Sequence, residues 1–198
     1  MKLTRQIPGA DLNQSIVFYE KLGFKIQTLG SRIIALDVQS CIEINSERTA
    51  RVCIQQHQSN WNKTLLNLKS HTPIIKTKKG YLITDHIGIW IKLIVETWDE
   101  KITSLNYKSL LGNYTGVCIE TLEVSKSYEF WNLLGFSSKS KDFSKGWIEI
   151  KSEVGDSISL IQAQQCPHLF FNPSMTYFNG SHNLEIIESI KKMKLQKK

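Results

Sequence analysis

Two stretches of this chain, residues 11–24 and residues 123–136, share one pattern 112 residues apart and without a gap. Each begins with an acidic residue, which is followed four residues later by a serine and seven and eight residues later by an aromatic pair, and each ends in Leu-Gly-Phe. A repeat at fixed spacing is typical of one supersecondary unit built twice. This repeat limits the fold more than any other feature, and it favours two domains of roughly 100 residues each.

The first copy lies in a recognisable local context. A strand is predicted over residues 3–7, Asp11 is the expected N-cap with Gln14 at the third helical position, and Gly23 is expected to end the helix. The strands expected after this helix cover residues 24–29, 32–38 and 41–45. The order of elements is therefore β-α-β-β-β.

Three further units of the same kind follow. The second has expected strands at 51–56, 73–76, 80–84 and 89–96, with a helix from Ser59. The third has a strand at 116–122, a helix at 125–134, and strands near Phe136, at 146–151 and at 157–162. The fourth begins with a strand at 175–178 and a helix from Asn183 to about Leu195.

The fourth unit lacks its three closing strands, which would leave a sheet edge with unpaired backbone groups. The linker, the first domain or a second chain could each cover this edge. Of these, we favour a second chain and therefore expect a homo-oligomer.

Composition is that of an ordinary globular protein, with 41% apolar and 22% charged residues. No apolar run approaches the roughly 20 residues of a membrane span, because Lys92 interrupts the best run, residues 87–95. Polar residues 4–6 occupy the place where a signal peptide would be apolar. We expect a cytoplasmic protein with buried, reduced thiols at Cys41, Cys53, Cys118 and Cys166.

The net charge of +7 is unevenly spread, since five lysines fall in the last eight residues and leave +2 without them. Lysines at the end of a helix solvate it and complement its dipole, which is the interpretation we favour. A tail that binds nucleic acid or a membrane surface is the alternative.

Two segments resemble the vicinal oxygen chelate superfamily, which includes glyoxalase I, extradiol dioxygenases, and fosfomycin- and bleomycin-resistance proteins. Residues 7–11 followed by residues 18–24 look most like the opening of bleomycin-resistance proteins. Residues 84–88 resemble the Asp-Pro-Asp-Gly turn of the family, with His86 and Ile87 in place of its proline and second aspartate. The resemblance covers residues 1–97 and, less closely, 114 to about 195.

The resemblance implies an α+β fold in which repeated β-α-β-β-β units form cupped, mostly antiparallel sheets with helices on the outer face. We expect a complete domain at 1–97, a linker with a helical piece at 98–113, and a second, incomplete domain at 114–198.

Metal ligands of the family come from four inward-facing strand positions, which fall here on Thr4, Glu43, Arg51 and Lys92. Only Glu43 keeps a ligand type, since Arg cannot deprotonate and a Lys ammonium is repelled by a dication. The corresponding positions of the second half are Gly116 and Ser159, which are poor substitutes. We therefore expect no bound metal and no cofactor.

If the alignment holds, Glu43, Arg51 and Lys92 face one cavity and suit a small polar or anionic molecule. Trp90 shares the face of Lys92, because side chains alternate along a strand, and could stack on a planar ligand. The structural alternatives are a salt bridge of Glu43 with Arg51 or Lys92 in a vestigial cavity, and core packing of Trp90.

The leading prediction is a metal-free small-molecule-binding protein, similar to glyoxalases and bleomycin-resistance proteins, that sequesters its ligand. The alternatives are a metal-dependent glyoxalase-like lyase or dioxygenase and a non-catalytic interaction protein, so whether the chain is an enzyme stays open. His57 and His86 are expected in turns, and Cys166 with His168 could give two zinc ligands without evident others.

Overall fold

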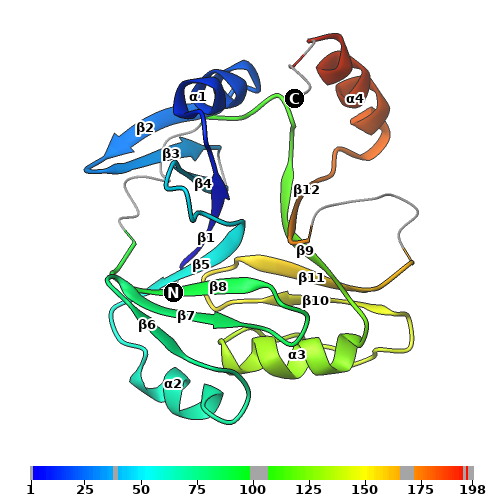
Figure 1. The fold of residues 1–198 in the computed structure, drawn as a ribbon. Coiled ribbons are helices and arrows are strands. Elements are labelled where there is room, and N and C mark those ends of the chain that lie inside the picture. The colour runs from blue at the N-terminus through cyan, green and yellow to red at the C-terminus, as the bar shows by residue number, and fades with distance from the viewer. Residues whose placement is uncertain (1, 38–39, 99–106, 166–171, 194, 196–198) are drawn as a thin grey trace. The chain divides into compact units, whose positions relative to one another are not determined.

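The structure is a computed structural model that describes residues 2–37, 40–98, 107–165, 172–193 and 195 (Figure 1). Cys166, His168 and much of the expected linker lie outside these residues. In chain order the elements are β1 (Lys2–Pro8), α1 (Leu12–Lys21), β2 (Lys25–Leu29), β3 (Arg32–Leu36), β4 (Cys41–Asn45), β5 (Cys53–Gln58), α2 (Asn62–Leu68), β6 (Ile75–Thr77), β7 (Gly80–Thr84), β8 (Trp90–Val95), β9 (Tyr114–Thr121), α3 (Val124–Leu133), β10 (Trp147–Lys151), β11 (Ser157–Gln162), β12 (Ser174–Tyr177), a 3-10 turn (Gly180–His182) and α4 (Asn183–Lys192).

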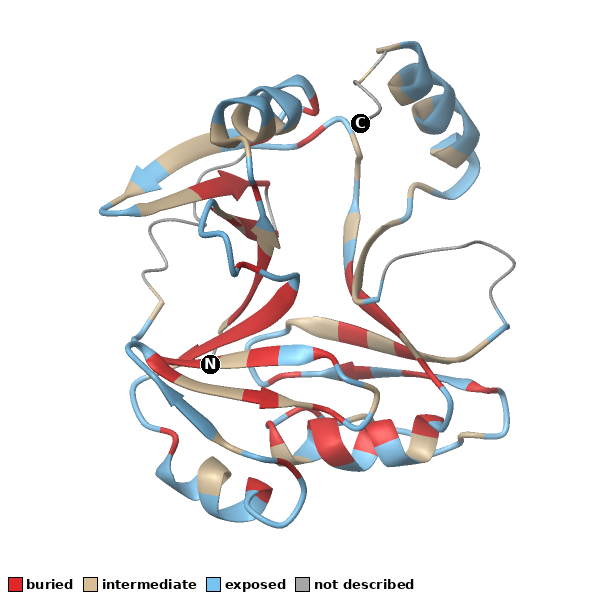
Figure 2. Cartoon of the chain, viewed as in Figure 1, coloured by how far each residue is buried: buried red, intermediate tan, exposed pale blue. Residues whose placement is uncertain are grey.

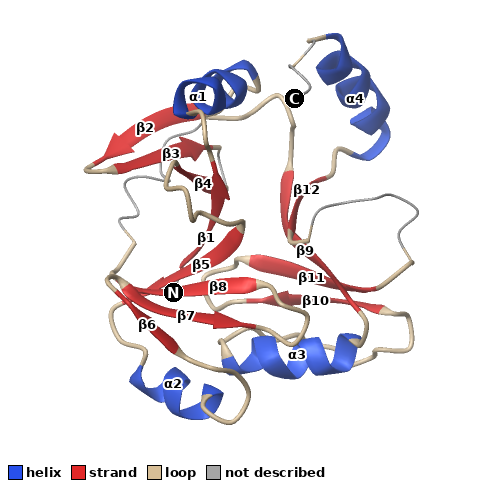
Figure 3. Ribbon diagram, in the orientation of Figure 1, coloured by secondary structure: helices blue, strands red, loops and turns tan. Residues whose placement is uncertain are grey.

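One strand topology occurs three times. The strand order is β2-β3-β4-β1 in the first repeat, β6-β7-β8-β5 in the second and β10-β11-β9 in the third. In each repeat the first strand pairs in parallel with the last, while the neighbouring pairs are antiparallel. Figure 3 shows the helix of each repeat after its first strand. The prediction of an α+β fold from repeated β-α-β-β-β units with mostly antiparallel sheets is confirmed.

The two Leu-Gly-Phe sequences end helices α1 and α3 in the same way. Gly23 and Gly135 have φ angles of 83° and 85°, in the left-handed region that favours glycine. The N–H of Phe24 then donates to the carbonyl of Tyr19 at 3.0 Å, and the N–H of Phe136 donates to that of Trp131 at 3.1 Å.

The chain divides into two compact units, each built from three segments. Unit 1 comprises residues 1–4, 52–98 and 116–175, so it holds the second and third repeats. Unit 2 comprises residues 5–51, 99–115 and 176–198, so it holds most of the first repeat and of the fourth. This division follows contacts between residues and not the order of the repeats along the chain. The domain boundaries 1–97 and 114–198 therefore stay a prediction.

Unit 1 contains one hydrophobic core that α2 and α3 share with their strands. Helix α3 contributes Tyr128, Phe130 and Trp131, and the sheets contribute apolar side chains such as Ile54 and Leu160. Figure 2 shows the row of buried positions along α3. Trp61 fixes the start of α2, since its Nε1–H donates to the carbonyl oxygen of Ile94 at 3.0 Å.

Unit 2 is held by a buried carboxylate, Asp37, at the end of β3. Its Oδ1 accepts the Ser109 N–H at 3.0 Å and its Oδ2 accepts the Ser109 hydroxyl at 2.7 Å. The Tyr177 hydroxyl donates to Oδ2 at 3.3 Å and lies 3.3 Å from the Ser40 hydroxyl. Burial is the main cause that raises the pKa of Tyr177. These bonds connect the first and fourth repeats through polar contacts.

The part of the chain that the structure describes has no helix that is both long and apolar enough to span a membrane.

Candidate ligand-binding site

The register of β5 and β8 separates two kinds of side chain in unit 1. Ile54 lies beside Ile91, and both belong to the core under the helices. The next pair along the strands, Gln55 and Lys92, must point to the opposite side because side chains alternate. We call this side the second face of the sheet. Gln55, Lys92 and His57 lie on this face together with Ile94, whereas the core side carries Ile54, Ile91 and Leu93 and also the buried Gln56.

Thr4, Gln55 and His57 form a buried hydrogen-bonded cluster on this face. The Thr4 hydroxyl donates to Gln55 Oε1 at 2.9 Å, and Thr4 Oγ1 lies 2.9 Å from His57 Nε2. All three residues are at most 3% exposed. Because the hydroxyl has one hydrogen and gives it to Gln55, His57 must donate through Nε2–H. The hydrogen-bond network therefore selects one tautomer of the imidazole.

The second face continues from this cluster to Lys92 and Trp90. Lys92 is half-buried and lies directly beside Gln55 in the parallel pair. Trp90 is two residues earlier on β8, with 38% of its surface exposed. The indole of Trp98 packs edge-on against the His57 ring, with 4.9 Å between ring centroids. A cation, a hydrophobic ring and a fixed imidazole thus share one region of unit 1.

Glu43 and Arg51 lie in unit 2. Glu43 is half-buried on β4, between Gln6 of β1 and Ile34 of β3. The Gln6 amide donates to the carbonyl of Arg51 at 3.0 Å and accepts from Asn45 at 3.0 Å. A polar row therefore runs along this face of the unit 2 sheet.

Arg51 does not occupy the strand position that the sequence predicted. Strand β5 begins at Cys53, so Arg51 lies in the preceding loop, where it is exposed and donates from Nη1 to the Ala50 carbonyl at 2.9 Å. Glu43 and Arg51 belong to one compact unit, and Lys92 and Trp90 belong to the other. A single site made of all four residues stays a prediction.

The donor chemistry does not fit a divalent metal ion. Among the residues that the structure describes, no three His, Cys, Asp or Glu side chains gather closely enough to hold one. The three described cysteines, Cys41, Cys53 and Cys118, are buried. On the second face, His57 is accompanied by hydroxyl, amide and ammonium groups, which are poor partners for a dication.

Asp85, in the turn that resembles the family's Asp-Pro-Asp-Gly sequence, has a structural geometry. Its Oδ1 accepts the N–H groups of Ile87 at 3.1 Å and of Ile89 at 2.8 Å, which closes the turn into β8. Burial raises the pKa of the Asp85 carboxyl, although these bonds act in the opposite direction. We therefore assign this carboxylate to turn formation.

Sequence reasoning missed Gln55 and His57 as candidate site residues. It placed His57 in a turn, whereas the structure places it within β5 (Cys53–Gln58). The signal was the sequence Gln-Gln-His-Gln between Ile54 and Ser59, which continues a strand because the first turn residues are Ser59 and Asn60.

Comparison with solved structures gives extradiol dioxygenases at low identity. Catechol 2,3-dioxygenase matches with a TM-score of 0.55 at 11% identity, over 96% of this chain and 74% of that one. An extradiol ring-cleaving dioxygenase from B. fuscum matches with a TM-score of 0.55 at 11% identity, over 97% of this chain and 61% of that one. Homoprotocatechuate 2,3-dioxygenase from Arthrobacter globiformis matches with a TM-score of 0.50 at 15% identity, over 97% and 68%.

These likenesses confirm the vicinal oxygen chelate fold that the sequence patterns predicted, and at such identities they show the fold alone. No family model matches the sequence, and no curated protein sequence matches it.

Proposed function

We propose that this chain binds a small polar or anionic molecule at the second face of unit 1, without a metal ion. The observation that carries the proposal is the buried Thr4–Gln55–His57 cluster beside Lys92. Polar side chains that converge on one region of a mostly apolar scaffold are typical of small-molecule sites. The protein would act by sequestration, as bleomycin-resistance-like members of the fold are expected to do, and no bond would be made.

Each residue has a distinct proposed role. Lys92 supplies a positive charge for an anionic group, and Trp90 supplies a flat apolar surface. Thr4 and Gln55 hold His57 in one orientation, so that the imidazole is preorganised. Glu43 and Arg51 remain proposed ligand residues of unit 2, where the polar row of Gln6 and Asn45 accompanies them.

The proposal is tested by calorimetric titration of the purified protein with benzoate, catechol and phosphate. The wild type is expected to bind at least one of these probes, and Lys92→Met is expected to bind it about tenfold or more weakly. Lys139→Met, an exposed lysine elsewhere in unit 1, is the matched control and should bind as wild type. Equal affinity of the Lys92 and Lys139 variants would contradict the assignment.

A dioxygenase-like enzyme is the second candidate, and the three ring-cleaving structural neighbours favour it. It would require metal ligands beyond the described donor set, for which the structure offers no trio. Metal analysis of protein purified without chelator distinguishes the two functions. Iron or manganese at one equivalent per chain, with oxygen uptake on addition of catechol, would replace the sequestration proposal.

We further propose a cytoplasmic homo-oligomer, in which another chain pairs with β12, an edge strand of its sheet. The buried cysteines support a reducing compartment. Native mass spectrometry of the full chain is expected to show a dimer or higher oligomer. A mass that corresponds to a monomer at every protein concentration would contradict the homo-oligomer. It would also remove the support for the alternative of a non-catalytic interaction protein.

A further inference from the structure

One internal segment, residues 48–84, has a net charge of +7. This segment contains seven Lys and Arg residues and no Asp or Glu. Taking these seven from the chain's 25 basic residues leaves 18, which equals the 18 acidic residues of the whole chain. Residues 48–84 and the C-terminal lysines are therefore the two concentrations of positive charge in the chain.

Five lysines of this segment lie in unit 1, on α2 and on the β6–β7 hairpin, and all five are exposed. Their positions are Lys63, Lys69, Lys76, Lys78 and Lys79. No acidic residue of the segment neutralises them along the chain. A single-sign cluster of this kind attracts acidic partners and repels basic ones.

The strand register places part of this charge on the α2 side of the sheet. Lys76 lies opposite Tyr81 in the β6–β7 pair. Tyr81 packs against the hydrophobic core that α2 covers, so Lys76 points to the same side as α2. Lys78 follows in the turn, next to Lys79, whose carbonyl accepts the Val95 N–H at 2.8 Å.

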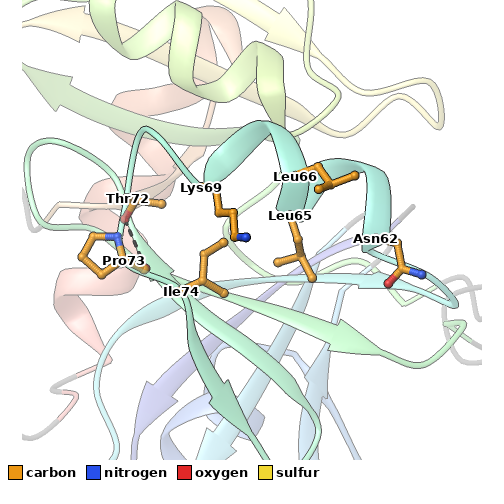
Figure 4. A pocket seen from close by; sticks show the side chains of 7 residues that line it. All are labelled: Asn62, Leu65, Leu66, Lys69, Thr72, Pro73 and Ile74. Atoms are coloured by element: carbon orange, nitrogen blue, oxygen red, sulfur yellow. Dashed lines mark hydrogen bonds between the residues drawn. The ribbon is translucent and has the colours of Figure 1, made fainter.

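An apolar groove of about 600 Å³ opens on this same side. Its lining combines α2 with the segment that leads into β6: Asn62, Leu65, Leu66, Lys69, Thr72, Pro73 and Ile74. Figure 4 shows Leu65, Lys69 and Ile74 in the middle, with Asn62 toward one end and Pro73 toward the other. Leu66 is 70% exposed and adds apolar surface to the lining of the groove.

The chemistry of the groove favours one kind of occupant. A nucleic acid would be expected to stack on exposed aromatic rings, but no residue that lines the groove is aromatic. Trp61, the nearest tryptophan in sequence, is buried. A concave strip of leucine, proline and isoleucine with Lys69 in its lining and Lys76 on the same side of the sheet matches the apolar face and acidic flank of an amphipathic helix.

We propose that this basic groove, formed by the seven lining residues together with Lys63, Lys76, Lys78 and Lys79, docks an acidic amphipathic segment of a partner protein. The apolar face of the segment lies against Leu65, Leu66 and Ile74. Its carboxylates lie beside the lysines of α2 and of the hairpin. The basic groove is on the opposite side of the sheet from the proposed small-molecule site, so the two functions are independent.

The test uses the full chain and fluorescently labelled synthetic helical peptides of about 18 residues. One peptide carries leucines at helical spacing and glutamates elsewhere. A second replaces the glutamates with lysines, and a third replaces the leucines with serines. Only the first is expected to bind, and its affinity should fall as salt rises from about 50 to about 300 mM. Binding of the serine peptide with equal affinity would overturn the role of the apolar groove.

Matched variants locate the surface. The double variant Lys76→Glu with Lys78→Glu is expected to weaken binding of the first peptide at least about tenfold, and Leu66→Ser should weaken it several-fold. The control, Lys139→Glu with Lys145→Glu, makes the same charge change at exposed positions of unit 1 and should leave affinity unchanged. Since all of these side chains are exposed, folding is expected to be preserved and is checked by circular dichroism.

Two further probes test whether the groove binds nucleic acid or a membrane surface instead. Oligo-dT and vesicles containing phosphatidylserine should bind more weakly than the first peptide. Tighter binding of either probe, with the same sensitivity to the Lys76 and Lys78 changes, would overturn the proposal in favour of nucleic acid or membrane. Equal peptide affinity of the two double variants would also overturn it.

Discussion

Helices α1 and α3 come from the same repeated sequence pattern, yet different interactions stabilise them. In α1 the Asp11 carboxylate caps the helix by accepting the Gln14 N–H at 2.9 Å, and none of the helical residues is fully buried. In α3 the equivalent Glu123 makes no side-chain cap, and five helical residues are buried. Phe18 is 39% exposed, whereas Phe130 at the same repeat position is 6% exposed.

This difference shows that the repeat determines where a helix starts and stops, while its surroundings determine how it is held. Both helices end at a left-handed glycine followed by a buried phenylalanine. Helix α3 packs into the single core of unit 1. Helix α1 packs against β2 and β4 without a fully buried residue, and it depends more on local hydrogen bonds. Matched substitutions at equivalent positions can test this conclusion.

The largest contrast is expected at the two phenylalanines. Phe130→Ala should lower the free energy of unfolding by about 3 kcal/mol or more, because it leaves a cavity in a close-packed core. Phe18→Ala should cost less than about 1 kcal/mol, since the ring is partly in solvent. Urea unfolding followed by tryptophan fluorescence measures both. Losses of equal size would refute the proposed difference between the helices.

The two serines should show a smaller contrast. Ser127 is fully buried and donates to Thr121 Oγ1 at 2.8 Å, so Ser127→Ala is expected to cost about 1 to 2 kcal/mol. Ser15 is half-buried and donates to the Asp11 carbonyl at 2.8 Å, where water can replace it. Ser15→Ala should therefore cost less than about 0.5 kcal/mol. The same urea titrations provide the comparison, and a reversed order would count against it.

At the helix caps the larger loss of stability is expected in α1 and the smaller one in α3. Asp11→Ala removes a capping hydrogen bond and should cost about 1 kcal/mol. Glu123→Ala removes no such bond and should change stability by less than about 0.5 kcal/mol. Hydrogen exchange of the first-turn amides of α1 should become faster only in the Asp11 variant. Unchanged exchange would show that the Asp11 cap contributes nothing.

The smallest effect at neutral pH is expected at Tyr19, where the second copy has Trp131. Burial raises the pKa of Tyr19 to about 12. The unfolded chain ionises near 10, so this residue costs no stability below pH 10 and lowers stability as pH rises from 10 toward 12. Tyr19→Phe should match wild type at pH 7 and lose less stability above pH 10. If the stability of the two proteins fell equally above pH 10, burial would not raise the pKa of Tyr19.

Much of the fold could be predicted from the sequence, because turn residues and apolar periodicity are local signals. The largest error was in the third repeat, which is the least regular in sequence. Near Phe136 a full strand was expected, but the described residues there form one bridge, between Ser137 and Lys151. The polar residues after Ser137 lack the alternation that would stabilise a strand. The grouping of repeats into compact units could not be predicted, since every repeat offers a similar apolar surface.

The candidate site was less predictable than the fold. Lys92 and Trp90 share a face as strand alternation required, with Lys92 beside Gln55 in the sheet. The expected strand at 51–56 was two residues too early at both ends, which put Arg51 on a strand and His57 in a turn. Such boundary errors change which side chains are counted on the strand, and therefore which are candidates. Thr4 and His57 are 53 residues apart, and only the folded sheet brings them together.

The interleaved chain path of the two units has a consequence for synthesis on the ribosome. Unit 1 needs its final segment, which runs to residue 175, and unit 2 needs residues from the C-terminal end. Neither unit can therefore be completed before most of the chain has emerged. The apolar strands of the nascent chain are exposed to solvent while the strands that pair with them are still being synthesised. Pairing between strands that are distant in sequence is also slow. The nascent chain should thus depend on chaperones more than a chain of equal length whose domains are consecutive.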